Sequence, residues 1–439
     1  MPDVLPFRGH LYDLSKAAAE NLVAPPYDVL SDADRAKLAG KSPLNVVHVD
    51  LPKQEEAPGA KDKYDAAAKI WMKWLAEKAI QRDSEAVYYR YRQDFTLPGD
   101  YSGKTHSRGG LIAAVRLYDF KEGIILPHEK TLDGPKQDRL SLTEATRMNL
   151  SPTFSFYFDP EGKIRKAMGE PGTPWADFTD DAGVRHRLWR ITDKNAQKAI
   201  QEAFSKRKLY IADGHHRYTT AIHYREKIRK ETGAKNHPAD FGMMFVAEAS
   251  EMTVLAYHRM LLAAEGMPGR KKAHQMLQEL SRFFLDERFS TKTPQERTAF
   301  LEKLGSCTAA CALGIVGPGH AHLLQTSDPK ALAAAFPSEV PAILRGLDVA
   351  VLQEIVLRQQ LGVDPQKIAQ GGVLGFSPNA SVIFDAVDSD KAQLGFLLRP
   401  TRVEQVRDVA EAGEVMPQKS TYFYPKVYTG LVFRSLESE

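Results

Sequence analysis

The sequence predicts a mixed α/β fold, of the looser α+β kind, divided into more than one packed unit. Stretches with the period-2 pattern of strands alternate with stretches of helical spacing through the first half of the chain, and strand-like patterns return near its end. The chain has 439 residues. Because this is about three times a typical domain of ~150 residues, two or more units are favoured.

The first half is expected to alternate strands with helices. Ser31 is a typical N-cap for a short helix, and Ile70, Trp71, Trp74 and Leu75 share one face of a longer one. Strands are expected at 4–7, 45–51, 86–95, 110–120, 153–158, 185–191 and 241–247, helices at 32–38, 64–78, 138–148 and 196–204, and a strand, turn and helix in succession over 208–228. The strands at 86–95 and 110–120 are expected to form a hairpin.

The second half is expected to be helical first and β-rich at its end. A more helical stretch is predicted from about residue 260 to residue 362. Strands are then expected at 380–386, 393–399 and 422–433.

Composition and charge exclude several classes of protein. The residues are 43% hydrophobic and 26% charged, as in ordinary globular proteins, and the formal net charge is only +3, too balanced for a protein that coats nucleic acid or an anionic membrane. Cys307 and Cys311 have neither redox nor zinc spacing and are expected to be packing residues. The sequence lacks a signal peptide and any run of ~18 apolar residues, so a cytoplasmic location and no membrane partner are expected.

The segment Asp213-Gly214-His215-His216-Arg217 is the strongest candidate for a site. A helix that begins directly after a glycine turn presents unpaired backbone N–H groups and the positive end of its dipole, which together suit phosphate. His215 and His216 can donate hydrogen bonds there, and Arg217 can offer a forked guanidinium. Asp213 can cap the helix, hold a metal ion or accept a substrate proton, and these roles stay open.

Three further segments carry candidate residues. Pro127-His128-Glu129-Lys130-Thr131 follows an apolar run; Glu129 can accept a hydroxyl proton or simply form a salt bridge. The segment 418–426 gathers lysines and hydroxyls that suit a second phosphate or a carboxylate, although an edge strand with solvated lysines fits it too. Asp28, displayed by two prolines and Tyr27, can orient an amine or magnesium, or be an ordinary turn aspartate.

The turn resembles the phosphate-contacting motif of the ParB and sulfiredoxin superfamily, most closely that of its free-serine kinases. The whole chain is similar to a bacterial and archaeal family known as domain of unknown function 1015. The segments that carry this similarity are 24–29, 42–46, 127–131, 212–218 and 416–426. The resemblance implies a ParB/sulfiredoxin-like domain over 1–250 with an insertion at about 85–195, and an α+β domain over 251–439 that returns 416–426 to the site.

The resemblance further implies a kinase that phosphorylates free L-serine to O-phospho-L-serine, with pyrophosphate, ATP or ADP as donor and Mg²⁺ as the expected ion. The residues expected to act fall into three groups: for catalysis His128, Glu129 and Asp213, for phosphate binding Gly214, His215, His216, Arg217, Lys419, Ser420 and Thr421, and for substrate binding Tyr27, Asp28 and Lys426.

Two other functions stay open. One is a ParB-like, nucleotide-gated DNA-binding protein, against which the near-zero net charge stands. The other is a metal-dependent phosphohydrolase that would use His128, Glu129, Asp213, His215 and His216 as its polar residues.

Overall fold

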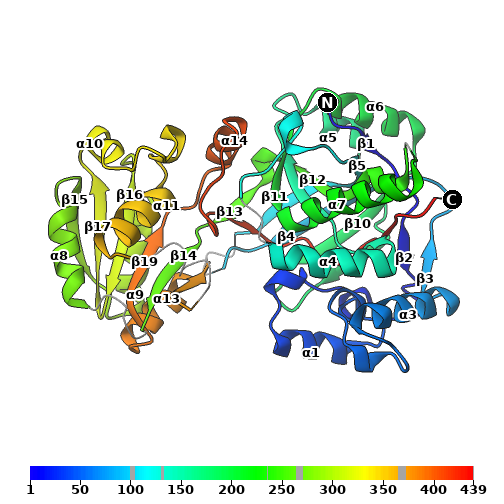
Figure 1. Cartoon of the computed structure of the whole chain (residues 1–439), viewed down its shortest axis with the longest axis horizontal. Helices are drawn as coiled ribbons and strands as arrows, with labels where there is room; N and C mark the ends of the chain where they lie inside the picture. The colour runs from blue at the N-terminus through cyan, green and yellow to red at the C-terminus, as the bar shows by residue number, and fades with distance from the viewer. Residues whose placement is uncertain (99–103, 130–132, 235, 264–269, 364–371, 439) are drawn as a thin grey trace. The chain divides into compact units, whose positions relative to one another are not determined.

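The computed structural model describes all residues except 99–103, 130–132, 235, 264–269, 364–371 and 439 (Figure 1). The chain forms two compact units. Unit 1 comprises Met1–Met252 together with Pro425–Glu439, and unit 2 comprises Thr253–Tyr424. The mixed α/β class predicted from the sequence is confirmed, because strands and helices are interleaved along both units.

A mixed sheet forms the centre of unit 1. Its strand order is β6 (Ile125–Leu126), β11 (Leu209–Asp213), β8 (Thr153–Tyr157), β12 (Phe241–Glu248), β5 (His106–Arg116), β4 (Tyr88–Phe95), β10 (Arg185–Ile191) and β9 (Ala176–Thr179), with β1 (Val4–Leu5) also on β5. The pairs β6–β11 and β8–β12 are parallel and the others antiparallel. The predicted hairpin is present as β4 and β5. Residues 85–195, expected as an insertion, thus supply many strands of the sheet that also holds β11 and β12.

The helices of unit 1 begin where side chains cap them. Ser31 accepts a hydrogen bond from the Asp34 N–H in a capping box, and Asp62 caps the first long helix. These helices are α1 (Asp32–Lys41), α2 (Val47–Asp50), α3 (Lys63–Ala76), α4 (Asp133–Thr146), α5 (Lys163–Met168), α6 (Lys194–Phe204) and α7 (His215–Thr232). Helices α4 and α7 lie side by side in Figure 1 and contact each other. The core around the sheet includes Phe204, Ile211 and Tyr218.

The C-terminal segment of unit 1 is fastened to several early parts of the chain. Thr429 exchanges two backbone hydrogen bonds with Ala24, and Phe433 does the same with His10. The two-residue strand β21 (Arg434–Ser435) pairs with β7 (Met148–Asn149). A second small sheet joins β2 (His10–Tyr12) to β3 (Ile80–Arg82). Residues 425–439 therefore complete unit 1 although they follow unit 2 in sequence.

Unit 2 is built on an antiparallel sheet. Its order is β15 (Phe284–Ser290), β17 (His320–Thr326), β16 (Ala312–Gly317), β19 (Ala392–Leu398), β14 (His258–Leu262) and β18 (Leu374–Ser377), and β13 (Thr253–Leu255) pairs with β20 (Tyr422–Tyr424) outside it. Its helices are α8 (Arg270–Leu280), α9 (Pro294–Gly305), α10 (Pro329–Ala334), α11 (Asp348–Ala350), α13 (Ala380–Asp388) and α14 (Val403–Glu411), with a further helical segment over Val351–Gln360. Cys307 packs against the core of this unit and Cys311 is buried, as the sequence predicts.

Two expected strands were wrong. The strand expected at 45–51 is helix α2. Buried Asn45 precedes this helix, and its Oδ1 accepts a hydrogen bond from the Val47 N–H at 3.1 Å, a local turn that competes with extended backbone. The strand expected at 380–386 is helix α13, which buries Ile383, Phe384 and Val387 on one face. The stretch expected to be more helical contains α8, α9, α10 and the helical segment Val351–Gln360, and it also holds strands β15, β16 and β17 of the unit 2 sheet.

None of the helices that the structure describes is long and apolar enough to span a membrane.

Candidate functional site

The predicted strand–turn–helix is confirmed at the junction of β11 and α7. Strand β11 ends with Asp213, and Gly214 takes the left-handed conformation with φ +86° before α7 begins at His215. As the N-cap residue, Gly214 has no side chain that could cover the first turn of the helix. A methyl group on Gly214 would also come within 2.8 Å of the Arg217 Nε. Glycine therefore allows both the turn and the close approach of Arg217.

Replacing Gly214 with alanine is expected to damage the site as well as the backbone. The positive φ alone should lower the free energy of unfolding by about 1–3 kcal/mol, and the clash should displace Arg217. Gly233, at the other end of α7, has φ +65° with nothing within 4 Å of the position that a methyl group would take, so Gly233→Ala is the matched control. Differential scanning calorimetry should find a lower melting temperature for both variants. Titration calorimetry should find weaker pyrophosphate binding only for Gly214→Ala. Equal pyrophosphate binding by the two variants would contradict a role of Gly214 at the candidate phosphate site.

Asp213 is held between two cations. Its Oδ2 accepts a hydrogen bond from the Arg217 Nη2 and its Oδ1 accepts one from the Lys426 Nζ, both at 2.7 Å. Burial alone would raise the pKa of this carboxyl, but Lys426 and Arg217 together hold the pKa well below its usual value. The carboxylate stays ionised at neutral pH and is a weak base. Its assignment as proton acceptor stays a prediction, whereas its contacts make it the anchor of Arg217 and Lys426.

Arg217 also ties the turn to the segment that precedes β8. Its Nη1 donates to the Ser151 Oγ at 2.8 Å and to the carbonyl of Pro152. The guanidinium thus contacts three groups at once, which fixes its plane as a single ammonium could not.

The histidines on either side of the turn brace it from within. The backbone N–H of His128 donates to the His215 Nε2 at 3.3 Å. The ring Nδ1 of His128 lies 2.8 Å from the carbonyl oxygen of Ile211. Both side chains are buried. Burial lowers the pKa of His128 to about 4, and burial together with the neighbouring His128 lowers the pKa of His215 well below its ordinary value. Both rings are neutral at pH 7, so the phosphate-binding role expected of His215 stays a prediction.

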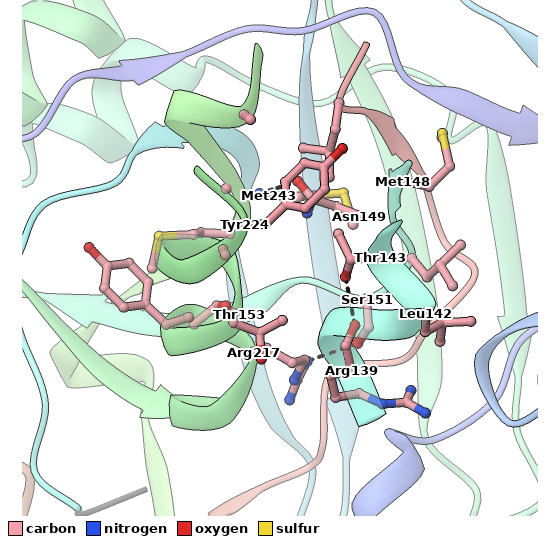
Figure 2. A pocket seen from close by; sticks show the side chains of 18 of the residues that line it. Arg139, Leu142, Thr143, Met148, Asn149, Ser151, Thr153, Arg217, Tyr224 and Met243 are labelled. Atoms are coloured by element: carbon pink, nitrogen blue, oxygen red, sulfur yellow. Dashed lines mark hydrogen bonds between the residues drawn. The ribbon is translucent and has the colours of Figure 1, made fainter. Parts of the chain in front are cut away.

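A pocket opens beside Arg217, among α4, α7 and the ends of several strands of unit 1 (Figure 2). Its polar lining includes Tyr27, Asp50, Arg139, Ser151, Thr153 and Arg217. Its apolar lining includes Leu142, Met148, Leu150, Met243 and Leu436. Arg139 of α4 and Arg217 of α7 both line the pocket, and Figure 2 shows them near each other at its lower edge.

Asp50, Arg139 and Tyr27 form the second polar group of this pocket. The Arg139 Nη1 donates to the carbonyl of Asp50 at 2.8 Å and to its Oδ1 at 3.1 Å, and the guanidinium lies 4.2 Å from the centroid of the Tyr27 ring. Burial raises the pKa of Asp50 in spite of Arg139 and Arg217. Burial, helped by Asp28, raises the pKa of Tyr27 to about 12. Tyr27, predicted to bind substrate, therefore lies at the pocket, and the neighbouring Asp28 is exposed.

Residues 4–350 match the family described as Protein of unknown function (DUF1015). The chain belongs to this family. The similarity stated from the sequence motifs is therefore confirmed. No curated protein matches the chain.

Solved structures similar to the chain include free serine kinases, with low overall agreement. A free serine kinase variant in complex with ADP is 11% identical, with a TM-score of 0.33 and coverage of 70% of this chain and 89% of that one. SbnI with a C-terminal truncation, from Staphylococcus aureus, is 12% identical, with a TM-score of 0.33 and coverage of 70% and 81%. A conserved hypothetical protein from Pyrococcus furiosus is 12% identical, with a TM-score of 0.32 and coverage of 70% and 89%.

The other residues that the sequence singles out in this family member lie in different places. Glu129 is half-buried just after β6, His216 is half-buried in the first turn of α7, and Lys130 and Thr131 fall outside the described residues. Lys419, Ser420 and Thr421 belong to unit 2. Within that unit the Lys419 Nζ lies 5.4 Å from the centroid of the Tyr257 ring, and the Ser420 hydroxyl donates to the Pro417 carbonyl. Their phosphate-binding role stays a prediction.

The residues around the turn do not form a preassembled magnesium site. Both oxygens of Asp213 accept from cations of this chain, and Asp50 is bound by Arg139. In the described ranges there is no cluster of three or more His, Cys, Asp or Glu residues arranged to hold a metal ion. The expectation of Mg²⁺ therefore rests on the phosphates of a donor rather than on protein ligands.

Sequence reasoning missed Asp50, Arg139 and Ser151. Arg139 reads as an ordinary helical arginine, and Asp50 lies in a segment expected to be a strand. The signal that could have found Asp50 is Asn45, whose side chain can accept from the N–H two residues later and so favours a turn over a strand.

Proposed function

We propose that the protein is a small-molecule kinase that transfers a phosphoryl group to the hydroxyl of free L-serine, giving O-phospho-L-serine. The observation that carries the proposal is the surplus of positive charge at the start of α7. One carboxylate, Asp213, is paired with both Arg217 and Lys426, which leaves one positive charge there, whereas Arg139 of the same pocket is paired with Asp50 and Asp138 and adds none. A cluster that retains net positive charge beside a helix N-terminus favours a phosphate group.

The phosphate cradle would be the first turn of α7. Gly214 lets an anion approach the backbone, His216 and the helix N–H groups supply donors, and Arg217 supplies a fixed guanidinium. Phosphoryl transfer depends mainly on positioning and on stabilising negative charge, which is what these groups offer. Lys419, Ser420 and Thr421 are proposed as further donors to the phosphoryl groups.

The acceptor would occupy the pocket next to the cradle. Tyr27, Asp50 and Arg139 line this pocket and are proposed as polar partners of serine, and the exposed Asp28 next to Tyr27 is proposed as a further one. Glu129 is proposed as the proton acceptor, because the low pKa of Asp213 makes that carboxylate a weak base. Asp50, with its raised pKa and its place in the pocket wall, is a second candidate for this step. Magnesium carried by the donor would supply charge neutralisation.

The proposal is tested by incubating the purified protein with L-serine, Mg²⁺ and, in separate reactions, pyrophosphate, ATP or ADP. Mass spectrometry should detect phosphoserine with at least one donor, and L-alanine, which lacks the hydroxyl, should give no phosphorylated product. Phosphate released equally with and without serine would indicate a phosphohydrolase instead. The absence of phosphoserine with every donor would refute the kinase.

A further inference from the structure

Two buried polar side chains, Gln93 and Arg108, lie directly opposite each other on β4 and β5 of unit 1. Each is 0% exposed. The ladder between these strands is made by the main chain, so sheet pairing does not require either side chain to be polar. Burying a guanidinium is costly unless its N–H groups find acceptors. The hydrogen-bond acceptors of Arg108 therefore indicate what this side chain contributes to the structure.

Both side chains bind the segment with which the chain re-enters unit 1. The Arg108 Nη2 donates to the carbonyl of Pro425 and to the Gln93 Oε1. The Gln93 Nε2 in turn donates to the carbonyl of Lys426 at 2.9 Å. The Arg108 guanidinium lies 4.5 Å from the centroid of the Phe154 ring, which fixes its plane. Two successive carbonyls are thus held by one buried pair.

The ammonium group at the end of the Lys426 side chain binds Asp213 of the candidate site. Its Nζ donates to the Asp213 Oδ1 at 2.7 Å, and Asp213 also receives Arg217. The backbone anchors at Pro425 and Lys426 determine where this long, flexible side chain starts. The first two residues after unit 2 are therefore the ones that Gln93 and Arg108 fix.

We propose that Gln93 and Arg108 are positioning residues that place the Lys426 ammonium at the phosphate site. Their effect on phosphate rests on the proposed function, but their effect on Lys426 does not. Burial lowers the pKa of Arg108 to about 10, opposed by Tyr91, Asp213 and Glu251, and the guanidinium stays charged at neutral pH. Arg108 thus adds positive charge within electrostatic reach of Asp213.

The test measures the rate at which Lys426 is acetylated, by competitive labelling and mass spectrometry of the full chain. Gln93→Glu keeps the shape of the side chain but places an oxygen where Nε2 donates to Lys426. Loss of one buried hydrogen bond should raise the labelling rate of Lys426 about fivefold, while exposed Lys230 reports the common baseline. Gln93→Met removes the same donor without adding charge, and it is the second variant if Gln93→Glu folds poorly.

Gln197→Glu is the matched control, because Gln197 is also buried and its Nε2 donates to the carbonyls of Ala86 and Ile191 in the same unit. It should leave the labelling of Lys426 unchanged. Unchanged labelling in both Gln93 variants, or an equal rise in Gln197→Glu, would overturn the proposal.

A double-mutant cycle separates positioning from general destabilisation. If Gln93 acts through Lys426, Gln93→Glu should weaken pyrophosphate binding several-fold in the parent chain and have no further effect in Lys426→Met. Additive losses would show that Gln93 acts independently of Lys426 and would overturn the proposal. If Lys426 labelling rises as expected but the parent protein forms no phosphoserine, the positioning role stands and the kinase assignment fails.

Discussion

Replacing Arg217 with lysine is expected to lower kcat/KM for phosphoserine formation by a factor on the order of 10³. The reason is geometric. One guanidinium contacts Asp213, Ser151 and the Pro152 carbonyl together, and a lysine ammonium cannot hold all three while facing a phosphate. Because lysine keeps the positive charge, the loss of kcat/KM measures the contribution of the forked guanidinium geometry rather than that of net charge. Steady-state kinetics with saturating serine and varied donor measure the effect.

Arg229→Lys is the matched control for this substitution. Arg229 lies near the other end of α7, is not among the residues that line the pocket, and pairs with Asp240 at 2.7 Å. Its replacement should change turnover less than about twofold, in keeping with the small contribution of a partly exposed ion pair. If Arg217→Lys retained turnover within tenfold of the parent while the fold was intact, the phosphate cradle would have to lie elsewhere.

Acid should destabilise the protein well above the pH at which its carboxylates titrate. The pKa of His128 is lowered from 6.5 to about 4 and that of His215 is lowered too, so the unfolded chain binds more protons than the native one between those values. Stability contributed by neutral His128 is complete above about pH 6.5 and is lost as the pH falls toward 4. A shift of this size corresponds to roughly 3 kcal/mol.

Urea unfolding at a series of pH values between 7.5 and 4.5 tests this expectation. His128→Asn should flatten the dependence of the unfolding free energy on pH, at the cost of some stability at pH 7.5. His223→Asn, at an exposed position of α7, should leave the dependence of the unfolding free energy on pH unchanged. A slope equal to that of the parent in His128→Asn would show that His128 is not the titrating group. The remaining dependence on pH comes from the other histidines whose pKa values burial lowers, namely His10, His186, His215 and His258.

The turn at Gly214 could be predicted because its signals are local. A strand, a glycine and a helix of basic residues follow one another within 208–228, and backbone geometry at that range depends on neighbouring residues alone. The histidines show where this reasoning ends. Their side chains were expected to face a ligand, but His128 and His215 are buried against each other. The side of a turn that becomes buried depends on the sheet to which the turn is attached. The other strands of that sheet are distant in sequence, so the local sequence does not reveal it.

The pocket and its supports depend on contacts between distant residues. Asp50 meets Arg139 only because α2 and α4 come together in unit 1, and Gln93 reaches Lys426 across most of the chain. A buried arginine such as Arg108 has no distinctive sequence pattern, since the same alternation describes a strand with a solvated arginine. The chemistry of these residues could be listed in advance, but their partners could not.

The return of Pro425–Glu439 to unit 1 has a consequence for how the protein is made. On the ribosome, Asp213 and Arg217 emerge long before Lys426, and all of unit 2 is synthesised in the interval. During that time strand β7 lacks its partner β21, and Asp213 lacks its second cation. The nascent chain therefore lacks part of the candidate site until Asp213 and Lys426, 213 positions apart, come together, and contacts at such separation are expected to form slowly. The proposed kinase activity is therefore expected only after residues 425–439 have packed into unit 1.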